Sequence, residues 1–179
     1  MNFNKLVLDK LLAVFREYNL NVINQSENYV EFASKKIVIT IRHNNLENSN
    51  LFFVGRNLGS LFLMDDQIIG NIFKTTLKFD FVTPEIFVNN LYEFFKNEGI
   101  LFLNGDEKTL KSLESYVYER SNNYTNELLD RQNMRSANKA WEENNYKDFV
   151  KFISKIDMEK LLPSYKLKYK MALKRISNQ

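Results

Sequence analysis

Histidine and cysteine supply many of the general bases, nucleophiles and zinc ligands of proteins, and this sequence holds one histidine and no cysteine. The histidine, His43, stands at the end of a predicted strand, between Arg42 and Asn44. A general base needs a nucleophile and an orienting group, and no such pattern accompanies His43. We interpret it as a strand-edge imidazole and expect no zinc site of the usual histidine and cysteine kinds.

Carboxylates offer a second chemistry, because several converging oxygen ligands can hold Mg²⁺ or Ca²⁺. Four acidic groupings occur: Asp65-Asp66, Asp106-Glu107, Glu142-Glu143, and Asp157 with Glu159. Adjacent residues on a helix do not face each other, and the first two pairs stand where helices should begin. The sequence therefore predicts capping and solvent-facing carboxylates, with no catalytic residue, no metal and no cofactor. An enzyme using only carboxylates would need two acids that converge in a cleft.

The segment Gly55-Arg-Asn-Leu-Gly59 is the remaining candidate, as a phosphate loop. It lacks the glycine-lysine-serine/threonine ending of a P-loop and the third glycine of a dinucleotide-binding turn. Glycines at a bulge or hairpin explain the pattern better. With these sites set aside, we expect a protein that is not an enzyme.

A basic segment near the C-terminus is the best candidate for a binding surface. Pro163 and the Ala, Met, Leu, Lys and Arg residues after it favour a helix. The candidate partner-binding residues on that helix are Lys166, Lys170, Lys174 and Arg175. The three lysines recur every four residues and so share one face, which suits an acidic protein or a nucleic acid. The alternative is a solvated final helix. The sheet face around Arg56 is a second possible contact.

Charge is distributed unevenly along the chain. The net charge of +3 combines +1 for residues 1–83, −4 for residues 84–145 and +6 for residues 146–179. The last segment holds nine Lys and Arg against three Asp and Glu. Such asymmetry bears on binding partners rather than on the fold.

The N-terminal part of the sequence changes from helical to alternating periodicity. Residues 3–18 place apolar side chains at helical spacing and predict an amphipathic helix. Five short β-rich runs follow: Leu20–Ile23, Tyr29–Phe32, Ile37–Ile41, Leu51–Val54 and Leu61–Met64. The connections between them are short enough for hairpins, so we expect an antiparallel meander with one face on the first helix.

Three further segments follow the meander. Asp65 is a suitable cap for a short helix through Phe73. Alternation over Leu77–Phe81 predicts a last strand. Thr83-Pro84-Glu85 combines a capping hydroxyl, a first-turn proline and an acid near the positive helix end, so it should begin a helix that ends at Asn97.

The rest of the chain has helical periodicity. Residues 106–120 form one predicted segment, with Leu110, Leu113 and Val117 inward, and residues 124–144 form another, with Leu128, Ala137 and Trp141. The sequence leaves open whether Ser121-Asn-Asn123 breaks the helix or bends it.

The run Asn138-Lys-Ala-Trp-Glu-Glu-Asn-Asn-Tyr-Lys-Asp-Phe149, followed by Tyr165 to Ala172, resembles one helix–turn–helix unit of a tetratricopeptide repeat. The resemblance implies a helical hairpin that small and aromatic residues hold together. Trp141 should then pack on Tyr146 or Phe149. The apolar stripe of the final helix should comprise Leu162, Tyr165, Tyr169, Ala172, Leu173 and Ile176.

Length and composition bound the possibilities. The 179 residues suit a single domain, 1–179, with a helix-plus-sheet sub-region, 1–83, and a helical sub-region, 84–179. Two Pro and five Gly argue against disorder, and fifteen Phe predict a core rich in rings. No run approaches the roughly 20 apolar residues of a membrane helix, and Asp9 and Lys10 interrupt any signal-peptide core. We therefore expect a cytoplasmic protein with no membrane partner.

These observations predict an α+β fold, in which an N-terminal helix packs on an antiparallel β-meander and a helical C-terminal half ends in a helical hairpin. This order, with Tyr29-Val-Glu-Phe32 in the meander and Ser164-Tyr-Lys-Leu-Lys-Tyr169 in the tail, resembles small bacterial α+β immunity proteins of polymorphic-toxin systems. The resemblance spans most of the chain. It implies a cytoplasmic, non-catalytic inhibitor or adaptor that neutralises a cognate protein, such as a toxin, by surface contact. The alternative is a nucleic-acid-binding regulator that uses the basic helix.

Overall fold

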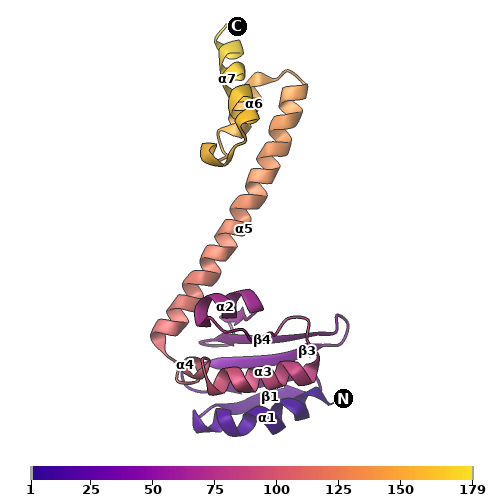
Figure 1. Cartoon of the computed structure of the whole chain (residues 1–179), viewed down its shortest axis with the longest axis vertical. Helices are drawn as coiled ribbons and strands as arrows, with labels where there is room; N and C mark the ends of the chain where they lie inside the picture. The colour runs from indigo at the N-terminus through magenta and orange to yellow at the C-terminus, as the bar shows by residue number, and fades with distance from the viewer. Residues whose placement is uncertain (1, 179) are drawn as a thin grey trace. The chain divides into compact units, whose positions relative to one another are not determined.

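A computed structural model describes residues 2–178 and has the predicted α+β architecture (Figure 1). The sheet region contains α1 (Phe3–Glu17), β1 (Asn21–Ser26), β2 (Tyr29–Ala33), β3 (Val38–Asn44), β4 (Ser49–Gly55) and β5 (Leu61–Leu63). The helices that follow are α2 (Asp66–Phe73), α3 (Pro84–Lys96), α4 (Ile100–Leu103), α5 (Glu107–Glu142), α6 (Tyr146–Ile153) and α7 (Pro163–Ser177), with a short 3₁₀ helix η1 (Met158–Lys160) before α7. The predicted fold class is confirmed.

The chain divides into two compact units, and the division falls inside α5. Unit 1 extends to Tyr118, and unit 2 begins at Glu119. Sequence reasoning placed its two sub-regions on either side of residue 83. In the structure α3, α4 and the first turns of α5 belong with the sheet.

The five strands of unit 1 form an antiparallel meander in the order β1-β2-β3-β4-β5, as predicted. Because side chains alternate along a strand, one face of the sheet collects the large apolar residues. On β3, Ile39 lies between Phe32 and Val54, and Ile41 lies between Val30 and Phe52. All six of these side chains are completely buried.

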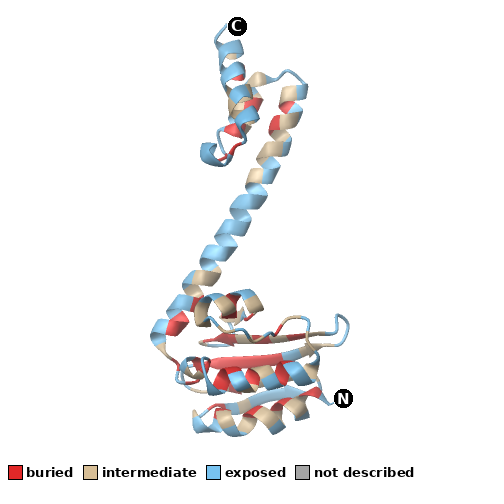
Figure 2. Cartoon of the chain, viewed as in Figure 1, coloured by how far each residue is buried: buried red, intermediate tan, exposed pale blue. Residues whose placement is uncertain are grey.

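Helices α1 and α3 supply the other half of the core. The repeat Val7, Leu11 and Phe15 places one fully buried stripe on α1, which packs on β1, β2 and α3. Helix α3 buries Phe87, Leu91, Phe94 and Phe95. Figure 2 shows buried residues on both helices and along β3. The predicted start of α3 is confirmed, because Thr83 caps it and Pro84 occupies its first turn.

Phe94 is the centre of a cluster of phenylalanine rings. Its ring centroid lies within 6.5 Å of the centroids of Phe52, Phe73, Phe79, Phe95 and Phe102. Edge-to-face and tilted pairs of this kind add to the stabilisation that burial alone provides. The cluster therefore links β4, α2, the segment before α3, α3 itself and α4.

The predicted strand at residues 77–81 is wrong. In the structure this segment is irregular, because side-chain groups take the backbone hydrogen bonds that a strand partner would make. The Asp66 carboxylate accepts hydrogen bonds from the backbone nitrogens of Phe79 (2.6 Å) and Asp80 (3.2 Å). Phe79 is buried and Phe81 is fully exposed, so the two do not share a face as they would in a strand, and the partner of the backbone is a carboxylate.

In unit 2, the end of α5 packs with α6 and α7 around small and aromatic residues. Ala137 and Ala172 are fully buried and allow the helices to approach closely, while Phe149 and Ile153 fill the centre. Trp141 packs on Tyr146 and Phe149, with ring centroids 5.5 and 5.0 Å apart, as predicted.

The predicted apolar stripe on α7 is only partly correct. Ala172 is buried, and Tyr165, Tyr169 and Ile176 are half-buried, but Leu162 and Leu173 are 64% and 43% exposed. Leu173 lies one position beyond Ala172, so helical rotation carries it past the edge of the buried face.

Helix α5 continues without interruption through Ser121-Asn-Asn123, where the sequence left open a break or a bend. Residues 118–129 of this helix are all exposed, including Leu128 at 38% (Figure 2). Ser, Asn and Thr are weak helix formers, and a helix gains most of its stability from tertiary packing. The middle of α5 is therefore its least stabilised part.

Truncation of Phe94 tests the ring cluster. Phe94→Ala should lower the free energy of unfolding by about 3–5 kcal/mol, because it removes a fully buried ring and leaves a cavity. Urea unfolding followed by circular dichroism measures the change. Leu58→Ala, at a site that is 55% exposed, is the control and should change it by less than about 0.5 kcal/mol. Similar values for the two variants would contradict the role assigned to the ring cluster.

Hydrogen exchange tests the middle of α5. Backbone amides of residues 119–129 should exchange faster than those of residues 110–117 and 134–142, where α5 buries Leu110, Leu113, Ala137 and Ala140. Mass spectrometry of peptides after timed exchange measures the difference. Equal protection along the whole helix would show that the exposed turns are stabilised by something other than packing.

Candidate functional site

His43 lies in a bridge of polar groups within unit 1. Its Nδ1 atom is 2.9 Å from Oδ1 of Asn50, and Nδ2 of Asn50 donates to the carbonyl oxygen of Val82 at 2.8 Å. The imidazole also lies 5.4 Å from the ring of Phe3, measured between centroids. The partners of His43 are thus an amide and an aromatic ring, which suits a bridge between β3, β4 and the segment before α3.

The acidic pairs Asp65-Asp66 and Asp106-Glu107 stand at helix starts, as predicted. Asp65 caps α2 by accepting from the nitrogen of Ile68 at 2.7 Å. Asp106 accepts from both the nitrogen and the hydroxyl of Thr109, each at 2.7 Å. These hydrogen bonds lower the pKa of Asp106 below its ordinary value. Among residues 2–178, no group of three or more His, Asp and Glu side chains is arranged to hold a metal ion.

Asp66 and Asp80 form a partly buried carboxylate pair in unit 1. The backbone nitrogen of Asp66 donates to Oδ2 of Asp80 at 3.1 Å, while Lys78 lies 3.5 Å from Oδ2 of Asp66. Burial, followed by repulsion from Asp66, raises the pKa of Asp80. The arrangement fixes the segment between α2 and α3.

Arg56, the second predicted contact residue, is bound within unit 1. Its guanidinium lies 2.7 Å from Oε1 of Glu107 and 2.8 Å from Oε1 of Glu114. These contacts raise the pKa of Arg56 and lower that of Glu107. Gly55 ends β4 and Gly59 lies in the β4–β5 connection, so both glycines belong to a hairpin, as predicted. A Cβ atom at Gly55 would stand 2.0 Å from the carbonyl oxygen of Ser60.

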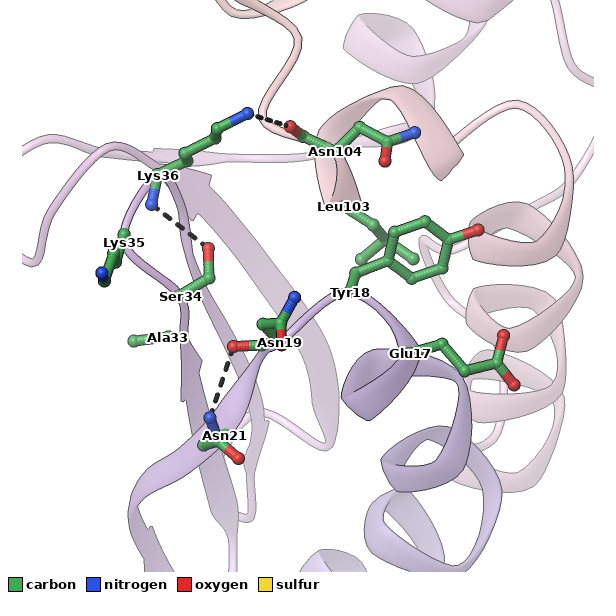
Figure 3. Close-up of a pocket in the computed structure, with 10 residues that line it drawn as sticks. All are labelled: Glu17, Tyr18, Asn19, Asn21, Ala33, Ser34, Lys35, Lys36, Leu103 and Asn104. Atoms are coloured by element: carbon green, nitrogen blue, oxygen red, sulfur yellow. Dashed lines mark hydrogen bonds between the residues drawn. The ribbon is translucent and has the colours of Figure 1, made fainter.

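A pocket of about 780 Å³ opens at one corner of unit 1, between the end of α1, the β2–β3 turn and α4 (Figure 3). Its polar groups bind each other: Nζ of Lys36 donates to the carbonyl oxygen of Asn104 at 3.2 Å, and Nδ2 of Asn21 donates to that of Asn19 at 3.3 Å. Glu17 is the one carboxylate among the lining residues. This pocket therefore lacks the two converging acids that carboxylate catalysis would need.

The predicted basic residues lie on α7 in unit 2. Tyr165 fixes the orientation of this helix, because its hydroxyl donates to Oδ1 of Asn138 on α5 at 2.8 Å. Lys170 and Lys174 are exposed and Lys166 is half-buried. Within residues 2–178, these three ammonium groups form no ion pair, hydrogen bond or cation–π contact.

Arg175, the fourth predicted residue, is directed differently. Its guanidinium lies 4.6 Å from the centroid of the Tyr146 ring and donates a hydrogen bond to the Tyr146 hydroxyl. Lys168, which sequence reasoning did not single out, lies 5.2 Å from the centroid of the Trp141 ring. Both cations therefore contact aromatic rings within unit 2, unlike Lys166, Lys170 and Lys174.

Sequence reasoning also missed two apolar residues beside the lysines. Leu167 is 61% exposed and Met171 is 40% exposed. Each follows a lysine in the sequence, so α7 presents a mixed surface, which we call the lysine–leucine face: Lys166, Leu167, Lys170, Met171 and Lys174. The four-residue spacing of Leu167 and Met171 was the available signal.

No protein-family model, no curated protein and no solved structure matches this chain. Within residues 2–178, no helix is both long and apolar enough to span a membrane.

The Asp106 cap should make stability depend on pH. Because folding lowers the pKa of Asp106, the cap stabilises the fold above the unfolded-state value of about 4 and loses this effect as the pH falls toward the folded-state value. Asp106→Asn keeps a hydrogen-bond acceptor without a titrating proton. Its free energy of unfolding should therefore fall less steeply below pH 4 than that of the unmodified protein.

Urea unfolding at a series of pH values between 5 and 2 measures the two slopes. Thr109→Val removes the hydroxyl donor but keeps the backbone donor, so its pH dependence should lie between the other two. Identical slopes for all three proteins would show that this cap does not couple protonation to folding.

Proposed function

We propose that this protein is a non-catalytic inhibitor or adaptor that acts in the cytoplasm and neutralises another protein by surface contact, in the manner of a bacterial immunity protein bound to its toxin. The lysine–leucine face of α7 is the proposed contact. Residues 119–179 carry thirteen Lys and Arg against eight Asp and Glu, which suits a partner with an acidic surface.

The observation that carries the proposal is the mixture of apolar and unpaired basic groups on one helix face. An exposed lysine alone is explained by solubility, but Leu167 and Met171 gain nothing from exposure to water. A partner that covers these two side chains would bury apolar area, and acidic groups around them would pair with the lysines. Met is also well suited to such contacts, because its flexible side chain adapts to irregular surfaces.

The same observation favours a protein over a nucleic acid. Binding to a phosphate backbone depends on counterion release by basic groups and gains little from aliphatic side chains. Interfaces between proteins combine apolar and polar side chains, and the lysine–leucine face offers both kinds.

Charge reversal tests the proposal. The triple variant Lys166→Glu, Lys170→Glu, Lys174→Glu should associate with the partner at least about tenfold more slowly at low ionic strength. Its association rate should also depend less on salt. The partner is first obtained by co-purification from the cells that express this chain, and association rates are then measured by surface plasmon resonance.

The matched control is Lys108→Glu, Lys111→Glu, Lys147→Glu, which changes the net charge equally at three exposed lysines outside α7. It should leave the association rate within about twofold of the original. Equal effects of the two triple variants would refute the assignment to α7. Tight binding to DNA or RNA with a steep salt dependence, lost in the first triple variant only, would favour the nucleic-acid function instead.

A further inference from the structure

Phe81 is an exposed aromatic residue in an unusual backbone conformation. It lies in the segment between α2 and α3, and its side chain is as exposed as in an extended chain, at 108%. Its φ angle is +58°, in the left-handed region that bulky residues rarely adopt. Burial does not explain this conformation, so the reason for a phenylalanine here must lie outside the core.

The backbone around Phe81 is held on both sides. Four hydrogen bonds between backbone and side chains hold it. Nδ2 of Asn90 donates to the carbonyl oxygen of Lys78 (2.6 Å) and Nδ2 of Asn50 to that of Val82 (2.8 Å), while the backbone nitrogens of Phe79 and Asp80 donate to the carboxylate of Asp66. The neighbouring ring of Phe79 is buried and packs on Phe52. The turn therefore fixes the backbone position of Phe81 before any partner binds.

A second fully exposed apolar residue lies at the same end of unit 1. Leu46, 98% exposed, is in the loop of the β3–β4 hairpin. Asn50, near the base of that hairpin, makes the hydrogen bond to Val82, the residue after Phe81. Figure 1 shows the hairpin loop and the start of α3 at the end of the sheet where the N-terminus lies.

The charged residues nearest in sequence to these two residues are acidic. Asp80 precedes Phe81, Glu85 lies in the first turn of α3, and Glu47 follows Leu46. Lys78 is close in sequence, but it is paired with Asp66. An aromatic side chain with acidic neighbours complements an apolar pocket with basic groups at its border.

We propose that Phe81 is the anchor of a second protein-binding surface, in which its ring enters an apolar pocket on a folded partner protein whose pocket is bordered by Lys or Arg, and Leu46 packs beside it. An exposed aromatic side chain on a fixed backbone suits this role because little backbone freedom is lost on binding. The acidic neighbours disfavour an anionic membrane as the partner. None of these residues lies on α7, so this surface is independent of the one proposed for the lysine–leucine face.

The experiment measures affinity for the partner as residues of this surface are truncated. A photo-crosslinking phenylalanine analogue at position 81 identifies the protein in contact with this site in the expressing cells. That protein is purified and titrated against the full-length chain by calorimetry. Phe81→Ala should raise Kd at least about 30-fold, Leu46→Ala should raise it less, and Leu58→Ala, an exposed leucine in the β4–β5 connection, should not change it.

Four outcomes would overturn the proposal. They are the absence of any crosslinked protein, equal affinity of Phe81→Ala and the original chain, a homodimer that only Phe81→Ala dissolves in sedimentation experiments, and Phe81-dependent binding to vesicles of phosphatidylcholine and phosphatidylserine. The triple charge-reversal variant of the α7 lysines is titrated in parallel, so a failed prediction for one surface can be distinguished from a failed prediction for the other.

A measurement of thermal stability distinguishes a binding role of Phe81 from a role in folding. Glycine adopts a positive φ angle without steric cost, so Phe81→Gly should leave the thermal midpoint unchanged or raise it by a few degrees. It should still abolish the Phe81-dependent part of the affinity. A lower midpoint would show that the ring serves the fold, and the proposal would be withdrawn.

Discussion

The phenylalanine rings between the sheet and helices α1 and α3 are the interaction on which unit 1 depends. A meander of short strands needs a cover on one face, and here the cover is built from rings: Phe15 on α1 meets Phe32 of β2 and Phe95 of α3 edge to face, with centroids 4.7 and 4.9 Å apart. Phe94 extends the same contacts to α2 and α4. The positions of the helix ends, and hence of the loops at the sheet margins, follow from this packing.

Most of the polar chemistry in unit 1 positions the backbone. Asp66 binds the segment before α3, Asp106 caps α5, Arg56 joins β4 to α5, and Asn50 connects the β3–β4 hairpin to Val82. Each of these side chains is fully engaged by groups of its own unit. The exposed lysines and aliphatic side chains on α7, and Phe81 with Leu46, lack such partners.

Periodicity in the sequence was enough to predict the first helix, all five strands, their antiparallel order and the start of α3. These features depend on local signals, such as the alternation in Ile37–Ile41 and the Thr83-Pro84 cap. Residues 77–81 were mispredicted because the alternation there is genuine but Asp66, distant in sequence, takes the backbone hydrogen bonds. The engagement of Arg175 by Tyr146 and the exposure of Leu167 likewise depend on how α7 rotates against its neighbours, which spacing alone does not determine. The partner-binding role of the α7 lysines stays a prediction.

The position of Trp141 has a practical consequence. It is the only tryptophan in the sequence, and it packs against Tyr146 and Phe149 in the core of unit 2. Light absorbed at 295 nm therefore excites unit 2 alone, and the emission of Trp141 reports the integrity of that unit while unit 1 stays optically silent. The protein thus carries a natural fluorophore by which the unfolding of unit 2 can be followed apart from that of unit 1.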